Sequence, residues 1–185
     1  MKYLLATSVS LALLALRAFG ECETTLVVSV PDQRLVVVQN GMRVAQYGVS
    51  TSKFGLSDSP RSFGTPLGAL EVTEKIGAGA PEGAVFKSRR PTGEVIRPNA
   101  RGRDPIVTRI LRLRGLEARN VRALDRGIYI HGTPEERNIG RPASYGCIRM
   151  RSSDVVKIFA TTPVGAKVEI VNVPVSRALR EVAVN

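Results

Sequence analysis

The feature that most constrains the fold is a hairpin pattern near the start of the chain. Residues 25–30 and 34–39 are rich in β-branched side chains, and Asn40-Gly41 follows them directly. An Asn-Gly pair favours the turn of a two-residue β-hairpin because both residues tolerate positive φ angles. We therefore expect residues 42–50 to return as the next strand. The run 35–38 is apolar at every position, which predicts strands that are covered on both faces.

The remainder of the chain continues this β pattern. Further strands are expected at 70–75, 106–114, 128–130 and 166–173. The glycine-rich segment 77–83 is expected to form a turn, and the basic, proline-containing segment 87–103 an exposed loop. We find no internal repeat and no linker, so the sequence predicts a single, mostly β domain over residues 25–173. The tail at 174–185 carries little signal.

One short helix is expected after Arg151. Ser152 or Ser153 can cap its first turn, in which Asp154 also lies. The apolar face of this helix would consist of Val155, Val156, Ile158 and Phe159.

Residues 1–20 are typical of a secretory signal peptide. Lys2 precedes an apolar run at 3–16, and small residues lie near Gly20, where we expect cleavage. The apolar run is too short to span a bilayer comfortably. Acidic Glu21 disfavours a lipid anchor on Cys22. We therefore expect export to the periplasm or cell-wall space, with no stable membrane span after cleavage.

The positive charge of the chain limits its partners. The formal net charge of +11 falls to +9 when Lys2 and Arg17 leave with the signal peptide. Such a charge favours nucleic acid, anionic membrane surfaces or acidic wall polymers as partners, or serves only solubility. Export argues against nucleic acid. The basic stretch 87–114 is a candidate surface for an anionic glycan.

The cysteines and the sole histidine suggest chemistry. Cys22 and Cys147 are the only cysteines, and an unpaired thiol in an oxidising compartment is either reactive or a liability. We interpret Cys22 as the liability and Cys147 as a nucleophile. A thiol with a pKa of ~8.5 needs a base at neutral pH, and His131 is the only imidazole available. On residue types alone, a buried inert cysteine and a structural histidine remain the alternative. His131 and Cys147 supply only two ligands, whereas zinc takes about three or four, so no metal is expected.

The residues around these two side chains carry a family resemblance. I-H-G-T at 130–133 and S-Y-G-C-I-R-M at 144–150 resemble the active-site motif of the L,D-transpeptidase (YkuD-type) catalytic domain. The hairpin at 26–41 and G-T-P-L-G-A-L at 64–70 match that family in the same order. The resemblance covers about residues 25–171. It implies a single-domain β-sandwich or barrel-like fold and exported enzymes that act on peptidoglycan stem peptides without a metal or organic cofactor.

The resemblance also implies roles for individual residues. Cys147 would be the nucleophile, and His131 its base and later its general acid. The backbone carbonyl of Gly132 would orient the imidazole, and Ser144 would assist in the same network.

Further roles concern the oxyanion and the substrate. The backbone N–H groups of Tyr145, Gly146 and Cys147 would form the oxyanion hole. Arg149 would hold the loop or face the substrate's carboxylate, and Thr133 would contact the substrate. Tyr145 is a departure, because the family usually has histidine at this position. His131 must therefore perform all imidazole chemistry alone.

The implied reaction is a two-step acyl transfer through a Cys147 thioester. Terminal D-alanine leaves a tetrapeptide stem, and the amine of a neighbouring stem then attacks, which links two third residues. The alternatives are an L,D-carboxypeptidase on the same fold and a wall-binding module with weak chemistry. Sortases and papain-like peptidases fit less well, since the T-L-x-T-C segment is missing and histidine precedes cysteine here. The oligomeric state is left open.

Overall fold

The computed structural model describes residues 23–182, so the predicted signal peptide and Cys22 lie outside the described part. Its strands are β1 (Thr24–Ser29), β2 (Arg34–Gln39), β3 (Met42–Gly48), β4 (Gly68–Ile76), β5 (Ala84–Lys87), β6 (Arg90–Val95), β7 (Ile106–Gly115), β8 (Tyr129–Gly132), β9 (Ile148–Met150) and β10 (Lys167–Val171). Its helices are α1 (Ser152–Thr161), α2 (Val175–Val182) and the 3-10 turns η2 (Ala118–Asn120) and η3 (Glu136–Asn138). The prediction of a mostly β chain is confirmed.

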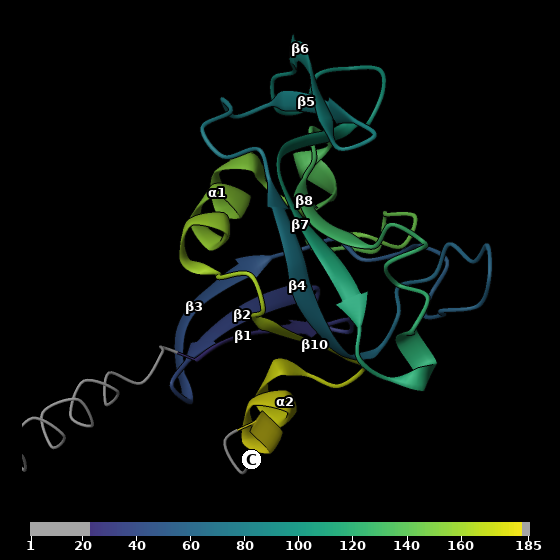
Figure 1. The fold of residues 1–185 in the computed structure, drawn as a ribbon, viewed down its shortest axis with the longest axis vertical. Helices are drawn as coiled ribbons and strands as arrows, with labels where there is room; N and C mark the ends of the chain where they lie inside the picture. The colour runs from purple at the N-terminus through teal and green to yellow at the C-terminus, as the bar shows by residue number, and fades with distance from the viewer. Residues whose placement is uncertain (1–22, 183–185) are drawn as a thin grey trace, which may run out of the picture.

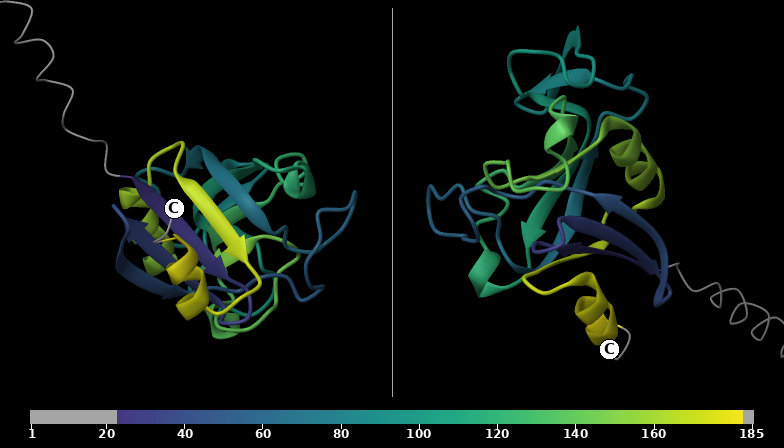
Figure 2. Two further views of the ribbon diagram at one scale, coloured as in Figure 1. Left: turned by 90° about the horizontal axis from the view of Figure 1, so that it is seen from below. Right: turned by 180° about the vertical axis from the view of Figure 1, so that it is seen from behind.

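All the strands belong to one curved sheet. Their order is β3-β2-β1-β10-β4-β7-β5-β6, and β8 leaves this path to pair with β7 and β9. The part that holds β1, β2 and β3 lies across the direction of β4 and β7 (Figures 1 and 2). Buried residues of both parts meet in one core, which gives the sheet its sandwich-like character. They include Leu26, Leu35, Leu70, Leu113, Ile130 and Ile170.

The predicted first hairpin is confirmed. Asn40 and Gly41 have φ angles of 49° and 76°, as the tight turn between β2 and β3 requires. Successive side chains of β1 and β2 point to opposite faces, so that Leu26 enters the main core while Val27 faces outward. Val175 covers that outer face as part of a second apolar cluster.

Helix α2 was not predicted from the sequence. It lies against the outside of β1 (Figure 1), where Val175 and Ala178 pack against Val27, Val36 and Val38. The apolar run 35–38 indicated that both faces of these strands are covered. The segment that covers the second face is the tail that carried little signal.

The segment 87–103 is exposed, as predicted, but it is not a loop throughout. Residues Arg90–Val95 form β6, which pairs with β5 and ends the sheet. Every residue of β6 is exposed. Proline is tolerated in such an edge strand because its missing N–H would point to solvent, and this explains how Pro91 takes part.

The start of α1 differs from the prediction. Arg151 is the N-cap residue and no side chain of its own turn caps the helix. The carboxylate of Glu136 instead accepts a hydrogen bond from the backbone N–H of Ser152, at 2.8 Å. The Ser152 hydroxyl is used elsewhere, 2.7 Å from the hydroxyl of Thr108. A distant carboxylate therefore replaces the local serine cap.

Neither helix in residues 23–182 has the length and apolar character that crossing a bilayer requires.

Replacing Ala178 by aspartate tests the packing of α2. The substitution would bury a carboxylate among the valines of the outer cluster, so we expect the free energy of unfolding to fall by about 3 kcal/mol. Ser176→Asp is the matched control, because Ser176 is exposed on the same helix. Urea unfolding monitored by circular dichroism measures both changes. Equal stability of the two variants would contradict the packing described here.

Candidate active site

The pairing of β8 with β9 determines where the predicted site residues lie. The two strands are parallel, with Ile130 opposite Ile148 and His131 opposite Arg149. Ile130 and Ile148 belong to the main core, so His131 and Arg149 point to the other face of the strands. Cys147 immediately precedes β9. The pairing thus brings together two motifs that are separated in the sequence. The predicted strand ended at residue 130, whereas β8 extends to Gly132 and includes His131.

The imidazole of His131 is fixed by its neighbour. Its Nδ1 lies 2.8 Å from the carbonyl oxygen of Gly132. A carbonyl oxygen only accepts hydrogen bonds, so Nδ1 carries the proton and Nε2 is left unprotonated. This geometry matches the role that the resemblance implied for Gly132.

Burial sets the charge state of His131. The residue is 5% exposed. Burial is the main cause that lowers the pKa of His131 from 6.5 to about 4. The charge of Arg149 acts in the same direction, and the Gly132 hydrogen bond and the charge of Asp104 oppose it. The imidazole is therefore neutral at physiological pH and able to accept a proton.

The thiol of Cys147 is protonated in the resting state. Its Sγ is half-buried and donates to the carbonyl oxygen of Gly127 at 3.3 Å. Burial raises the pKa of Cys147, although the Tyr129 backbone N–H and the charges of Arg149 and Arg126 oppose this effect. A neutral thiol thus accompanies a neutral imidazole, and the thiol becomes nucleophilic only when its proton is transferred.

Ser144 shapes the turn 144–147 that carries the thiol, which we call the nucleophile turn after the role predicted for Cys147. Its hydroxyl donates to the carbonyl oxygen of Cys147 at 2.6 Å and accepts from the N–H of Gly146 at 3.2 Å. Gly146 has a φ of 119°, and a Cβ at this position would lie 3.2 Å from the Gly64 carbonyl oxygen. The turn therefore requires glycine.

Two of the three backbone N–H groups predicted to form the oxyanion hole are available to a ligand. The N–H of Gly146 is already donated to Ser144. Within the described part of the chain, the N–H groups of Tyr145 and Cys147 donate to no protein acceptor. These two groups are the ones that an oxyanion could use.

Arg149 and Thr133 converge on Asp104, which the sequence did not single out. Nη1 of Arg149 lies 2.6 Å from one carboxylate oxygen of Asp104, and the buried Thr133 hydroxyl donates to the other at 2.6 Å. Arg149 also donates to the carbonyl oxygen of Ala143 at 3.4 Å, in the loop before the nucleophile. Of the two roles that the resemblance implied for Arg149, this geometry favours holding the loop over facing the substrate's carboxylate. The substrate contact expected of Thr133 stays a prediction.

Thr65, in the G-T-P-L-G segment, supports the nucleophile turn from the other side. Its hydroxyl donates to the carbonyl oxygen of Gly146 at 3.0 Å and accepts from the N–H of Ser52 at 3.0 Å. The threonine therefore connects the loop between β3 and β4 to the residue before Cys147. The sequence motif matched the family, but this role is visible only in the structure.

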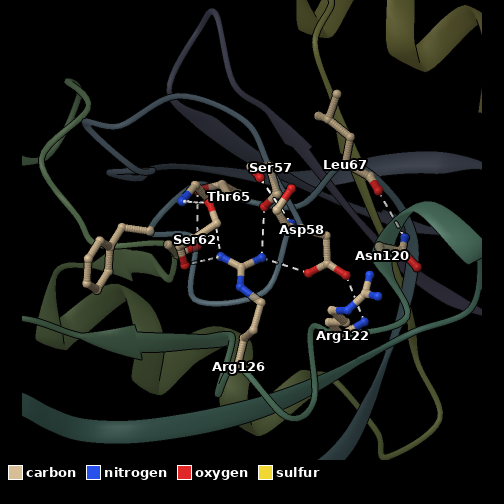
Figure 3. Close-up of polar contacts among 12 residues, drawn as sticks. Ser57, Asp58, Ser62, Thr65, Leu67, Asn120, Arg122 and Arg126 are labelled. Atoms are coloured by element: carbon tan, nitrogen blue, oxygen red, sulfur yellow. Dashed lines mark hydrogen bonds and ion pairs between the residues drawn. The ribbon is translucent and has the colours of Figure 1, made fainter.

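Arg126 holds the loop between β3 and β4 in place (Figure 3). Its Nη1 donates to the Asp58 carboxylate at 2.7 Å, and its Nη2 donates to the carbonyl oxygens of Ser62 and Gly64. The side chains of Arg126 and Asp58 are only 8% and 4% exposed. Removing either partner would leave an uncompensated buried charge, so the pair holds the loop in one geometry. Asp58 also accepts from the backbone N–H of Arg122 at 2.7 Å.

The assembled parts fit nucleophilic acyl transfer. A thiol, a neutral imidazole with Nε2 free of the proton and two unoccupied N–H groups lie on adjacent segments. No group of three or more histidine, cysteine, aspartate or glutamate residues in the range 23–182 could hold a metal ion.

The low pKa of His131 predicts a pH dependence of stability. Unfolding restores the ordinary pKa of 6.5, so the unfolded chain binds a proton that the folded chain refuses between pH 6.5 and 4. We expect His131 to reduce the free energy of unfolding by about 3 kcal/mol as pH falls through this window. In His131→Asn this part of the pH dependence should vanish. Urea titrations at several pH values measure it, and identical pH profiles would refute the burial described here.

Replacing Thr65 by valine tests the support of the nucleophile turn. The variant keeps the shape of the side chain but leaves the Ser52 N–H and the Gly146 carbonyl without their partner. We expect a loss of about 2 kcal/mol in the free energy of unfolding. Thr65→Ser keeps the hydroxyl and should lose less than about 1 kcal/mol. If the serine variant is no more stable than the valine variant, the hydroxyl is not the important group.

Comparisons with known proteins identify the family of this chain. The family model of the YkuD L,D-transpeptidase catalytic domain matches residues 23–170. YqjB of Bacillus subtilis and ErfK/SrfK of Escherichia coli, both with L,D-transpeptidase in their names, are 41% and 46% identical over 66 and 46 residues. These matches cover 35% and 25% of this chain, but only 36% and 15% of the two relatives.

Solved structures show the same fold. An L,D-transpeptidase from Mycobacterium tuberculosis H37Rv superposes with a TM-score of 0.52 and 17% identity, over 81% of this chain and 58% of that one. One from Xylanimonas cellulosilytica gives 0.51 and 18%, over 83% and 63%. With a family model that spans most of its length, this chain belongs to the L,D-transpeptidase (YkuD-type) catalytic domain family.

Proposed function

We propose that this protein is an exported L,D-transpeptidase that cross-links the third residues of peptidoglycan stem peptides through a Cys147 thioester. The observation that carries the proposal is the imidazole of His131, held by Gly132 with its Nε2 unprotonated, on the strand beside the Cys147 turn. Export rests on the signal-peptide pattern of residues 1–20. Stem peptides are the substrates on which this family acts.

In the first step the thiol replaces D-alanine. Nε2 of His131 takes the proton of the thiol while the sulfur attacks the carbonyl carbon of the third residue of a tetrapeptide stem. The N–H groups of Tyr145 and Cys147 stabilise the resulting oxyanion. When the C–N bond breaks, the imidazolium returns the proton to the amine of the leaving D-alanine, and a thioester remains.

In the second step an amine of a neighbouring stem attacks the thioester. His131 removes a proton from the attacking nitrogen, the C–S bond breaks, and the sulfur regains a proton. The products are a new amide between two third residues and the free enzyme. Two moderate barriers replace a single high one, which is the contribution of covalent catalysis.

Hydrolysis is the second candidate function. Tyr145, which lies in the turn that carries Cys147, is 55% exposed, so water can approach this side of the site. If water replaces the acceptor amine in the second step, the same residues perform an L,D-carboxypeptidase reaction.

The reaction products distinguish the candidates. We would incubate the protein from Glu21 to Asn185 with disaccharide tetrapeptides and analyse the mixture by mass spectrometry. The expected product is a dimer that lacks one D-alanine, and Cys147→Ala should form none of it. Cys22→Ala is the matched control, since it removes the other cysteine and should retain full activity. Tripeptide monomers alone would assign the carboxypeptidase reaction.

The absence of any product would contradict both candidates. With the protein folded and the Cys147 thiol reduced, such a result would favour the wall-binding module.

A further inference from the structure

Three exposed aromatic side chains gather beside the nucleophile turn. The ring centroids of Phe54, Phe63 and Tyr145 lie 5.3–5.8 Å apart in all three pairs. Their exposures are 54%, 56% and 55%. Two of the rings come from the loop between β3 and β4, and the third comes from the turn that ends at Cys147. We call these three side chains the aromatic platform.

A lysine lies against the platform. Nζ of Lys53 is 4.3 Å from the centroid of the Tyr145 ring and 5.2 Å from that of Phe54. It also donates a hydrogen bond to the Tyr145 hydroxyl at 3.0 Å, and this contact lowers the pKa of Tyr145. The platform therefore combines apolar ring faces with a hydrogen-bond donor at its edge.

The backbone below the platform is fixed. Arg126 donates hydrogen bonds to the carbonyl oxygens of Ser62 and Gly64, the two neighbours of Phe63 in the chain. Figure 3 shows the contact with Ser62. The N–H of Lys53 donates to the carbonyl oxygen of Ser144 at 3.1 Å, and the N–H of Phe54 donates to Ser52 Oγ at 3.0 Å. A ligand would thus meet a surface that is already ordered, which reduces the entropy cost of binding.

The platform by itself is too small for a stable protein–protein interface, and it suits a sugar better than a stem peptide. An aromatic side chain buries at most about 250 Å², so three half-exposed rings offer much less than the ~800 Å² per partner of a stable protein interface. A stem peptide has short side chains and several carboxylates, and it has no broad apolar face to lay on three rings. A pyranose ring has such a face in its axial C–H groups, and its hydroxyl and acetamido oxygens can accept from Lys53.

Resting on the proposed function, we propose that the aromatic platform binds the N-acetylated amino sugar of the glycan strand that carries the reacting stem. Consecutive Cα atoms are ~3.8 Å apart, so Tyr145 lies no more than ~8 Å along the chain from Cys147. Three extended stem residues span up to ~10 Å. A sugar on the platform therefore leaves the third residue of its own stem within reach of the thiol.

A binding experiment tests the platform independently of catalysis. The probe is a peptide-free oligomer of β-1,4-linked N-acetylglucosamine, and saturation-transfer NMR detects its contact with the protein. We expect Phe54→Ala/Phe63→Ala to weaken binding about tenfold, because the variant removes two of the three ring faces. Met42→Ala/Val164→Ala is the matched control, because it removes two exposed apolar side chains elsewhere and should bind like wild type. Equal binding by wild type and the phenylalanine variant would overturn the proposal.

A kinetic experiment connects the platform to the reaction. We expect the phenylalanine variant to lose about tenfold in kcat/KM with a disaccharide tetrapeptide and to keep wild-type kcat/KM with the sugar-free tetrapeptide. An equal loss with both substrates would overturn the proposal. So would a loss of binding to anionic lipid vesicles with unchanged oligosaccharide binding, which would assign the rings to a membrane surface. If wild type turns over neither substrate, the proposed function fails, while the oligosaccharide titration still decides on the platform.

Discussion

The pairing of β8 with β9 is the constraint on which the site depends. Ile130 and Ile148 are drawn into the core because both are fully buried there. The two-residue alternation of a strand then turns His131 and Arg149 to the other face, whatever their own preferences. The hydrophobic effect thus places the imidazole beside the nucleophile turn, and the polar contacts of Gly132, Ser144 and Thr65 adjust the final geometry.

Most of the fold follows from local pattern. The Asn40-Gly41 turn, the strands around it and the helix after Arg151 are all encoded within a few neighbouring residues. Helix α2 was not predicted because its apolar residues are buried only by contact with the valines of β1 and β2, which lie far away in the sequence. The cap of α1 was not predicted for a related reason, because Glu136, which accepts the hydrogen bond from the Ser152 N–H, belongs to another segment.

The site likewise contains residues that a local motif predicts and residues that only the folded chain brings together. His131, Cys147 and their glycines were recognisable because the motif around them is short and specific. The supporting charges were not: Asp104 lies in a basic stretch without a motif, and Asp58 meets Arg126 across 68 residues of sequence. Such pairs are determined by how the chain folds back on itself, and a single sequence has no local signal for them. The family resemblance left Arg149 either to hold the loop or to face the substrate's carboxylate, and it implied a substrate contact for Thr133. The structure shows that both side chains contact Asp104, a residue that no motif indicated.

The protonated state of Cys147 has a consequence for its resistance to oxidation. Oxidants and foreign disulfides react with thiolates far faster than with thiols, and the first product, a sulfenic acid, leads on to irreversible forms. A nucleophile whose pKa is raised by burial exposes little thiolate to such reagents. If the protein is exported as proposed, the arrangement that delays activation until a substrate arrives also protects the thiol from oxidation between turnovers.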